Sequence, residues 1–319
     1  MADLTILITG AGGFLGRATV AAARAAGHQV VAMTRVPVAW GDPGVTGYVA
    51  HLGEDSLPEV LGEVDVVIHA AAILSGDDAV QLRDTVAPTR VMLQAMKSLA
   101  KPPRLVHVSS LSVLGYTDLP PMSQVDEMTP LETAPDKRDA YTRAKLRQEV
   151  DVLAAGDRFA VLILRPGTIY GPDRLWNSHV GVGVGPVLIR IGGAGTIPLI
   201  HVTDCATALV KAAEQPGKIG ERQILHLVGD NLPDRPRFLA ALRKGGWPRL
   251  VLPLPWQALD LAGRLLSAVP GLPGLLRPPV LRARMMPLHY ANDRAKAALG
   301  WQPGIDFATG MARALEGRA

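Results

Sequence analysis

A glycine-rich turn between an apolar strand and an alanine-rich helix constrains the fold of this chain most strongly. Residues 4–9 are short, β-branched and uncharged, as expected of a strand buried on both faces. From Gly13 the pattern becomes helical and ends at Gly27. Gly10 permits a tight turn, Gly13 lets the backbone approach a pyrophosphate, and Gly16 lets the helix pack on the strand. Because the helix N-terminus offers free N–H groups to phosphates, this segment predicts dinucleotide binding.

Short apolar strands and helices continue to alternate after this turn. Further strands are predicted over residues 28–34, 47–51, 65–69, 104–109, 159–164 and 223–228. Helices are predicted over 56–61, 78–100, 139–155 and 203–214, with Pro88 kinking or restarting the second of them. Strands and helices in alternation, joined by right-handed crossovers, indicate the α/β class: a doubly wound parallel sheet of the Rossmann type.

The second half of the chain departs from this alternation of strands and helices. Residues 172–196 are rich in glycine and are predicted to be a mobile segment, either a lid or a plain solvent loop. Residues 231–319 are helical and punctuated by proline. We therefore expect a dinucleotide-binding domain over 1–172, rejoined by 197–230. A smaller, mostly helical substrate-binding lobe would comprise 173–196 and 231–319.

Composition narrows the class of protein. The 33 Lys and Arg against 29 Asp and Glu are scattered along 319 residues, which does not favour nucleic-acid binding. The single cysteine, Cys205, excludes an internal disulfide. A strand begins by residue 4, and the apolar stretches are broken well short of about 20 residues, so neither a signal peptide nor a membrane span is expected. We expect a cytoplasmic protein.

Three side chains predict proton-transfer chemistry. Tyr141 and Lys145 lie one helical turn apart on the same face of a predicted helix. An adjacent cation stabilises a phenolate and lowers its pKa. Ser110 follows the fifth strand, at the sheet edge where ligands bind, and its hydroxyl could hold a substrate carbonyl. A Tyr-x-x-x-Lys spacing also arises by chance in amphipathic helices, so its weight comes from the combination with Ser110 and the glycine turn.

Several motifs together carry a family resemblance. They are Thr9–Gly16 (TGAGGFLG), His69–Ala71 (HAA), Ser109–Gly115 (SSLSVLG), Tyr141-x-x-x-Lys145 and Arg165–Pro172 (RPGTIYGP). In their order and spacing the chain resembles the extended short-chain dehydrogenases/reductases, which include nucleotide-sugar epimerases, 3β-hydroxysteroid dehydrogenases and dihydroflavonol reductases. The resemblance covers roughly residues 3–230 and leans toward the 3β-hydroxysteroid dehydrogenase and dihydroflavonol reductase branch.

This resemblance implies roles for individual residues. Tyr141 would be the general acid/base, Lys145 would bind the nicotinamide ribose and lower the tyrosine's pKa, and Ser110 would orient the substrate, with Ser109 and Ser112 as supporting hydroxyls. Thr168 would also face the substrate. With Tyr141 and Lys145, the cofactor would contact Gly10, Gly12, Gly13, Phe14, Leu15, Gly16, Arg35, Leu52, Ala70, Ala71 and Pro166. No metal is expected.

Two positions depart from the family pattern. Where the family often has Asn-Val-x-Gly-Thr, this chain reads Thr85-Val86-Ala87-Pro88-Thr89, so Thr85 or another group must replace the asparagine. The third strand commonly ends in Asp-Leu near the adenine, and here the pair is His51-Leu52. The adenine contact is therefore less well defined than the phosphate contact.

Cofactor choice depends on Arg35. NAD enzymes place an acidic residue at the end of the second strand for the ribose 2′-hydroxyl, whereas an arginine suits a 2′-phosphate. This chain has Arg35 there and no acid before Asp42. We predict NADP over NAD. The alternative is that Arg35 is a solvated turn residue or stacks on the adenine.

The substrate segment lacks a charged anchor. Where nucleotide-sugar enzymes tend to carry Arg-Asp-Phe, this chain has Ile197-Pro198-Leu199, and the acids that dehydratases use beside the orienting hydroxyl are replaced by Leu111-Ser112. Arg282 and Arg284 could bind a diphosphate or lie on the surface. We expect interconversion of an alcohol and a ketone on a small or apolar substrate. The alternatives are a nucleotide-sugar epimerase or ketoreductase with tightly bound NAD, and a non-catalytic dinucleotide-binding regulator.

A homodimer is also expected. The helical stretches 85–99 and 139–155 expose apolar positions, and in the family such helices pair across a two-fold axis, although Pro88 alters the first of them.

Overall fold

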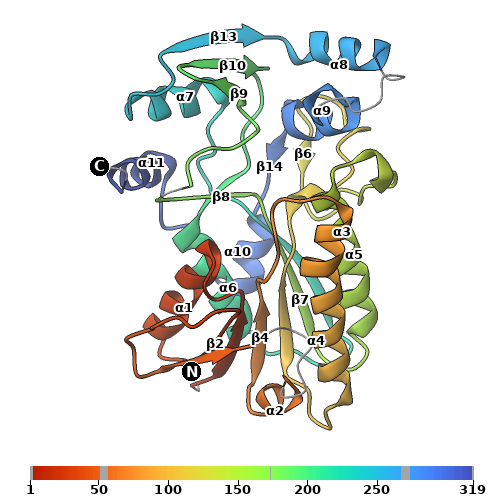
Figure 1. Cartoon of the computed structure of the whole chain (residues 1–319), viewed down its shortest axis with the longest axis vertical. Coiled ribbons are helices and arrows are strands. Elements are labelled where there is room, and N and C mark those ends of the chain that lie inside the picture. Colours follow the sequence, from red (N-terminus) through yellow and green to blue (C-terminus); the bar gives the residue numbers. More distant parts are fainter. Residues whose placement is uncertain (1–2, 51–56, 173, 267–273, 318–319) are drawn as a thin grey trace.

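A seven-stranded parallel sheet forms the body of the molecule (Figure 1). The computed structural model describes residues 3–50, 57–172, 174–266 and 274–317. The strand order is β12-β7-β5-β4-β1-β2-β3, and every neighbouring pair is parallel. The strands are β1 (Thr5–Thr9), β2 (Gln29–Thr34), β3 (Val45–Val49), β4 (Val66–His69), β5 (Arg104–Val108), β7 (Val161–Pro166) and β12 (Arg222–Leu227). The predicted doubly wound Rossmann-type sheet is confirmed.

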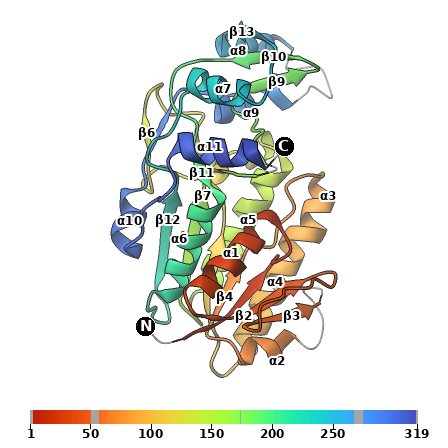
Figure 2. The same cartoon turned by 90° about the vertical axis from the view of Figure 1, so that its left-hand side faces the viewer.

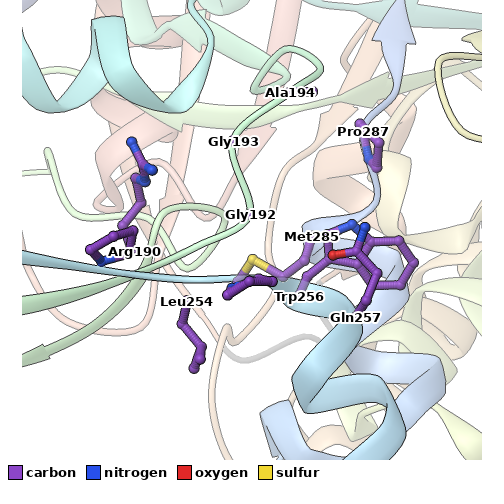
Figure 3. Close-up of a pocket in the computed structure, with 11 residues that line it drawn as sticks. Arg190, Gly192, Gly193, Ala194, Leu254, Trp256, Gln257, Met285 and Pro287 are labelled. Carbon is purple, nitrogen blue, oxygen red and sulfur yellow. The ribbon is translucent and has the colours of Figure 1, made fainter.

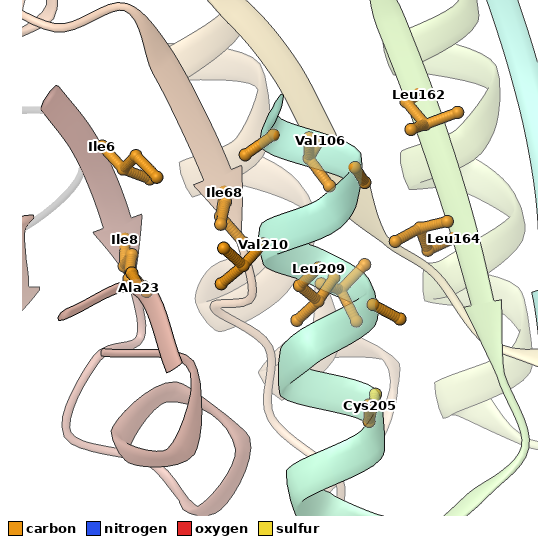
Figure 4. Close-up of a cluster of buried hydrophobic side chains, with 14 of the residues drawn as sticks. Ile6, Ile8, Ala23, Ile68, Val106, Leu162, Leu164, Cys205, Leu209 and Val210 are labelled. Atoms are coloured by element: carbon orange, nitrogen blue, oxygen red, sulfur yellow. The ribbon is translucent and has the colours of Figure 1, made fainter. Parts of the chain in front are cut away.

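Helices cover both faces of this sheet. One face packs against α1 (Phe14–Ala25), α6 (Val202–Glu214) and α10 (Asp293–Leu299). The other packs against α2 (Leu57–Gly62), α4 (Ala87–Ser98) and α5 (Ala140–Ala155). Figure 4 shows the first face, where Leu209 and Val210 of α6 lie over isoleucine, leucine and valine side chains of four strands. Burial on both faces explains why the central strands are almost continuously apolar.

The helix expected over residues 78–100 is interrupted. It begins as α3 (Asp78–Gln81), passes through one π-helical stretch over Leu82–Val86, and continues as α4 from Ala87. Pro88 lies in the first turn of α4, directly after the π-helical stretch, and Val86 and Ala87 keep right-handed helical backbone. The chain therefore stays helical past the proline, and the irregularity predicted there, a kink or a restart, takes the form of a π-helical stretch.

A second group of elements, which we call the lobe, lies beyond the carboxyl ends of the strands (Figures 1 and 2). It contains a three-stranded sheet in the order β13-β10-β9 and three helices. These are β9 (Gly181–Val184), β10 (Val187–Ile191), β13 (Leu250–Leu254), α7 (Arg235–Arg243), α8 (Trp256–Leu265) and α9 (Pro278–Met285).

Residues 172–196, predicted to be a mobile lid or loop, instead contain the β9–β10 hairpin of the lobe. Its glycines have a conformational reason. Gly181 has φ +143° and a Cβ there would lie 1.9 Å from the Ile189 carbonyl oxygen, while Gly185 turns the hairpin with φ +55°. Other residues would be strained at both positions, so these glycines allow the hairpin to adopt one defined conformation.

Short elements connect the two parts. β8 (Thr168–Tyr170) pairs with β11 (Leu199–His201), and β6 (Gln124–Val125) pairs with β14 (His289–Tyr290). Single 3-10 turns lie at Leu111–Val113, Pro135–Lys137 and Gly274–Leu276, and α11 (Phe307–Glu316) packs near α7. Across the described ranges, none of the helices has the length and apolar character needed to cross a membrane.

Candidate active site

The glycine turn predicted to bind phosphates has crowded, left-handed geometry. Gly10 has φ +69°, and a Cβ on it would lie 2.9 Å from the Ala71 Cα. A Cβ on Gly16 would lie 2.1 Å from the Gly10 carbonyl oxygen, so Gly16 lets α1 pack on the turn itself. Gly13 is the N-cap of α1 and provides no side-chain cap, which leaves the first N–H groups of that helix free for a ligand. These features fit the pyrophosphate of a dinucleotide.

Beside this turn the structure forms a cleft of about 1570 Å³. A drug-sized ligand usually occupies a pocket of roughly 300–1,000 Å³. The cleft therefore has room for a dinucleotide and a substrate together. Every described residue of the predicted site lines it: Gly10, Gly12, Gly13, Phe14, Leu15, Gly16, Arg35, Ala70, Ala71, Ser110, Ser112, Tyr141, Lys145, Pro166 and Thr168. Leu52 lies outside the described residues.

The end of β2 carries positive charge into the cleft. Arg35 is exposed, and Asp84 has its pKa lowered mainly by its bond with Arg83 and to a smaller extent by the charge of Arg35. Arg83 also lines the cleft, and its guanidinium bonds the Asp84 carboxylate at 2.6 Å. Two guanidiniums and one carboxylate therefore meet where the ribose of a dinucleotide would reach the end of β2.

The segment after β4 is held by a buried polar network. Thr9 Oγ1 accepts a hydrogen bond from the Ala71 N–H at 3.3 Å and shares another with His69 Nδ1 at 2.8 Å. His69 Nε2 lies 2.9 Å from Thr89 Oγ1, and burial lowers the pKa of this imidazole to about 3. A neutral histidine thus links β1, β4 and α4 beneath Ala70 and Ala71.

Thr85, which stands at the position of the family's asparagine, is part of the same region. Its hydroxyl accepts from the Ile73 N–H at 3.1 Å and donates to Gln81 at 3.2 Å. The buried hydroxyl therefore fixes the loop after β4.

Ser110, Tyr141 and Lys145 converge at the centre of the cleft. Ser110 follows β5, and its Oγ accepts from the Ser112 N–H at 3.1 Å. The Ser110 hydroxyl also lies close enough to the Tyr141 phenol to act on the pKa of that phenol. Asp139 caps α5 by accepting from the Thr142 N–H at 2.9 Å, which places Tyr141 in the first turn. One turn later, buried Lys145 donates from Nζ to the Val108 carbonyl at 2.9 Å.

The two titratable groups of this trio shift in opposite directions. Burial raises the pKa of Tyr141 to about 12, although the neighbouring Ser110 hydroxyl acts in the lowering direction. Burial also lowers the pKa of Lys145 to about 8, opposed by the negative charge of Glu149. The expected lowering of the tyrosine pKa by Lys145 is not seen, because desolvation of the phenolate is larger and the ammonium is directed to Val108.

A buried ion pair between Glu149 and Arg165 lies next to Lys145. Glu149 lies one turn after Lys145 on α5, and both of its carboxylate oxygens bind the Arg165 guanidinium at 2.9 and 2.6 Å. The Ser109 hydroxyl donates to the same carboxylate. Both Ser109 and Ser110 line the cleft, and the Ser109 hydroxyl is directed to Glu149 of the buried ion pair.

The lobe forms one wall of the cleft, and most residues of this wall were not predicted from the sequence. Trp176, Asn177 and His179 line the cleft, together with Ala283 and Arg284 of α9. The Asn177 Nδ2 and Ser112 Oγ are buried without a hydrogen-bond partner among the described residues. The signal was available, since these aromatic and amide side chains directly follow the RPGTIYGP motif at the carboxyl edge of the sheet.

The two arginines considered for a diphosphate are separated. Arg282 binds the Asp260 carboxylate twice, at 2.8 Å each, and does not line the cleft. Arg284 lines the cleft and lies 3.3 Å from Asp139.

Arg235 joins three segments of this wall. Its side chain is 1% exposed and donates to the carbonyls of His179 at 2.8 Å, Ala194 at 2.8 Å and Arg284 at 3.1 Å. A second cavity of about 310 Å³ lies beyond, lined by Gly192–Ala194, Trp256 and Met285 among others (Figure 3). Within the described part of the chain, no group of three or more His, Cys, Asp or Glu side chains is arranged to hold a metal ion.

Fold and cleft together define a dinucleotide-binding enzyme of the extended short-chain dehydrogenase/reductase type. A family model described as the NAD dependent epimerase/dehydratase family matches residues 6–227. The chain therefore belongs to the NAD-dependent epimerase/dehydratase family, and its chemistry is nicotinamide-dependent oxidoreduction.

Two relatives match along nearly the whole chain. One is a 3-diazoavenalumate denitrifying reductase from Streptomyces sp, 29% identical over 94% of this chain and 96% of that protein. The other, from Stigmatella aurantiaca, is a 4-hydroxy-2-methyl-3-oxo-4-farnesyl-3,4-dihydroquinoline-1-oxide ketoreductase, 30% identical over 95% of this chain and 93% of that protein.

Solved structures show the same fold at lower identity. The UDP-glucuronic acid 4-epimerase of Bacillus cereus, in complex with NAD, is 19% identical, covers 98% of each chain and has a TM-score of 0.72. The predicted resemblance to the extended short-chain enzymes is confirmed, and the alternative of a non-catalytic regulator has no support among these relatives.

Proposed function

We propose that the protein interconverts an alcohol and a ketone on an apolar substrate, using Ser110, Tyr141 and Lys145. The observation that carries this proposal is that Ser110, Tyr141 and Lys145 line one cleft together with the glycine turn, with the Ser110 hydroxyl beside the Tyr141 phenol. Both hydroxyls can reach one substrate oxygen, which is the arrangement that proton transfer to a carbonyl requires.

The chain's own groups handle the proton and the developing charge. With a pKa raised to about 12, Tyr141 is protonated at neutral pH and can give its proton to a carbonyl oxygen as the ketone is reduced. Ser110 donates a hydrogen bond to the same oxygen. Lys145 uses one N–H on Val108, which leaves two for ribose hydroxyls. When bound, the nicotinamide dinucleotide supplies the hydride for reduction, or accepts it in the reverse direction.

NADP is the proposed cofactor within this NAD(P)-using chemistry. Support comes from Arg35 at the end of β2, from Arg83 beside it, and from the ion pair that neutralises Asp84. A guanidinium pair suits a 2′-phosphate better than a ribose hydroxyl.

An apolar substrate is favoured by the composition of the cleft. Ile197 and Leu199, at the position where nucleotide-sugar enzymes carry charge, are buried in the core of the lobe side. Arg282 is bound to Asp260, and Arg284 has Asp139 beside it. Two full-length relatives are a reductase and a ketoreductase of aromatic compounds by their names. The unpartnered Asn177 and Ser112 groups would bind a polar substituent of the substrate.

A nucleotide-sugar epimerase with retained NAD is the second candidate. It is favoured by the similarity to solved epimerase structures that contain NAD and UDP sugars. Copurified NAD and tight calorimetric binding of a UDP sugar would support it over ketone reduction.

A panel of apolar ketones and alcohols, assayed with NADPH and NADH, tests the main proposal. Tyr141→Phe is expected to lower kcat by about 10²- to 10⁴-fold while dinucleotide binding is retained, because the proton donor is lost and the fold is not. Tyr170→Phe is the matched control, since Tyr170 is buried outside the cleft. Full activity in Tyr141→Phe would contradict the assignment.

We also propose a cytoplasmic homodimer. The sole cysteine, Cys205, is buried and free, which suits a reducing compartment. Leu82, Val91 and Val150 are exposed on the adjoining surfaces of the π-helical stretch, α4 and α5, and could pack across a two-fold axis. Light scattering of the wild type and of Val150→Asp measures this, with a dimer expected for the first and a monomer for the second.

A further inference from the structure

The outer face of the lobe sheet is apolar, covered by α8 and α9 at Ile189 and Ile191 and exposed over the rest. Leu250 pairs with Val187 and Val184 across the three strands, and Leu252 pairs with Ile189 and Val182. Directly opposite residues point to the same face of a sheet. On this face Leu250 is 51% exposed, Leu252 49% and Val184 62%. The alternate side chain Leu188 is fully buried against α7, so one face is core and the other faces solvent beyond α8 and α9.

Helix α8 extends this surface. Its Trp256 and Leu259 pack on Ile191 and α9, at the end of the same sheet. Leu261 and Leu265, one helical turn apart, are 59% and 76% exposed. Figures 1 and 2 place β13, β10, β9 and α8 together at the end of the molecule farthest from α2. Exposed apolar side chains that occur singly are normal, but a gathered set marks an interaction surface.

The segment that supplies α7, β13, α8 and α9 has an excess of positive charge. Residues 235–292 contain nine Lys and Arg and one acid, Asp260, whereas the rest of the chain has the remaining 24 basic and 28 acidic residues. Asp260 is neutralised by Arg264 at 2.9 Å and Arg282 at 2.8 Å. The exposed cations lie in or directly beside these elements: Arg243 and Lys244 at the end of α7, Arg249 before Leu250 of β13, Arg264 of α8 between Leu261 and Leu265, and Arg277 before α9.

We propose that this surface, comprising the outer side of β9, β10 and β13 and the exposed side of α8, docks the protein on an anionic lipid membrane. Apolar side chains flanked by lysine and arginine are the pattern of a peripheral membrane surface, with leucines entering the interface and cations meeting lipid phosphates. A second copy of the chain is a poorer occupant, because a two-fold contact would bring the same excess of positive charge against itself.

Docking here would place the second cavity beside the lipid. Leu254 and Trp256, which line that cavity, lie at the junction of β13 and α8 (Figure 3). The inference itself does not depend on the catalytic proposal, since it rests on the surface alone.

Vesicle co-sedimentation of the full chain tests the proposal. The wild type is expected to bind vesicles of phosphatidylglycerol and phosphatidylcholine, to bind pure phosphatidylcholine weakly, and to lose binding as salt is added. The double variant Leu261→Gln/Leu265→Gln should weaken binding by about tenfold or more, because two leucines no longer enter the interface. Ile219→Gln is the matched control, being 71% exposed on the connection after α6.

A second pair of variants tests whether membrane binding depends on the positive charge of the lobe. Lys244→Gln/Arg249→Gln should weaken binding to the anionic vesicles by about fivefold per cation removed. Lys97→Gln/Lys101→Gln removes two exposed cations near the end of α4 and should bind as the wild type does. Equal binding to neutral and anionic vesicles, or unchanged binding in both lobe variants, would overturn the proposal. So would self-association by light scattering that the leucine variant abolishes, since the face would then join two copies of the chain.

Discussion

Two buried arginines show how differently the sheet and the lobe are built. Arg165, on β7, is 3% exposed and forms a two-bond ion pair with Glu149 of α5. Arg235, on α7 of the lobe, is 1% exposed and donates to three backbone carbonyls from separate segments. In the sheet, a charge is matched by a carboxylate beneath the residues proposed to be catalytic. In the lobe, a charge joins the segments at His179 and Ala194 to the last turn of α9 through their backbone carbonyls.

The comparison of the two arginines separates a contribution to the stability of the fold from a contribution to substrate specificity. The ion pair lies between two elements of the main core, so its loss affects the whole fold. The Arg235 contacts join the segments that hold His179, Ala194 and Arg284, so their loss changes the cleft wall. We therefore expect the sheet to fix the chemistry and the lobe to select the substrate.

The largest effect is expected from breaking the ion pair. Glu149→Gln should lower the free energy of unfolding by about 3–5 kcal/mol, because Arg165 is left buried without its carboxylate. Asp151→Asn on the same helix is the control, since its pair with Arg90 is partly exposed and should contribute less than about 1 kcal/mol. Urea denaturation followed by circular dichroism measures both. A similar small loss in the two variants would contradict the role given to the buried pair.

A smaller and more local effect is expected from the lobe arginine. Arg235→Met leaves three carbonyls without their donor and should raise the KM for substrate by about tenfold, with dinucleotide affinity unchanged, since the wall and not the glycine turn is altered. Steady-state kinetics and dinucleotide titration separate the two quantities. If dinucleotide affinity fell in parallel with substrate affinity, the division between sheet and lobe would be wrong.

The most narrowly confined effect is on the preference for NADPH over NADH, because only one residue at the end of β2 is changed. Arg35→Ala should reduce the preference for NADPH over NADH by about tenfold, because a charge-assisted contact to the 2′-phosphate is lost. The measurement is kcat/KM with each cofactor. Arg83→Ala, which removes the neighbouring cation already paired with Asp84, should reduce it less. An unchanged ratio in Arg35→Ala would contradict the NADP proposal.

Sequence reasoning succeeded where burial imposes a pattern. Strands such as Val66–His69 are buried on both faces and therefore read as continuous apolar runs, and the glycines at 10 and 16 are forced by contacts of 2.9 and 2.1 Å. The parallel, doubly wound class of the sheet followed from the alternation of strands and helices and the crossover rule. Ser110 and Tyr141 could be brought together because strand ends meet at one edge of a parallel sheet.

Prediction from the sequence failed where tertiary contacts alone determine the local structure or the pKa of a side chain. The β9–β10 hairpin was read as a mobile segment because its glycines, including Gly181, hide the strand pattern. The pKa of Tyr141 could not be anticipated, since helix spacing shows the nearby lysine but not the desolvation. The basic residues of the lobe looked scattered in the sequence, although residues 235–292 contain nine Lys and Arg against one acid.

The path of the chain has a consequence for how this molecule could be altered. After β8 the chain enters the lobe, returns for β11, α6 and β12, enters the lobe again through α7–α9, and comes back to α10, which packs beside β12. Asp204 in the first turn of α6 then accepts from the Gly304 and Ile305 N–H groups, at 2.9 and 3.1 Å, and ties the last segment down. A graft that exchanged the lobe for that of a relative would need several cut points, and single substitutions along the cleft wall are the simpler route to a new specificity.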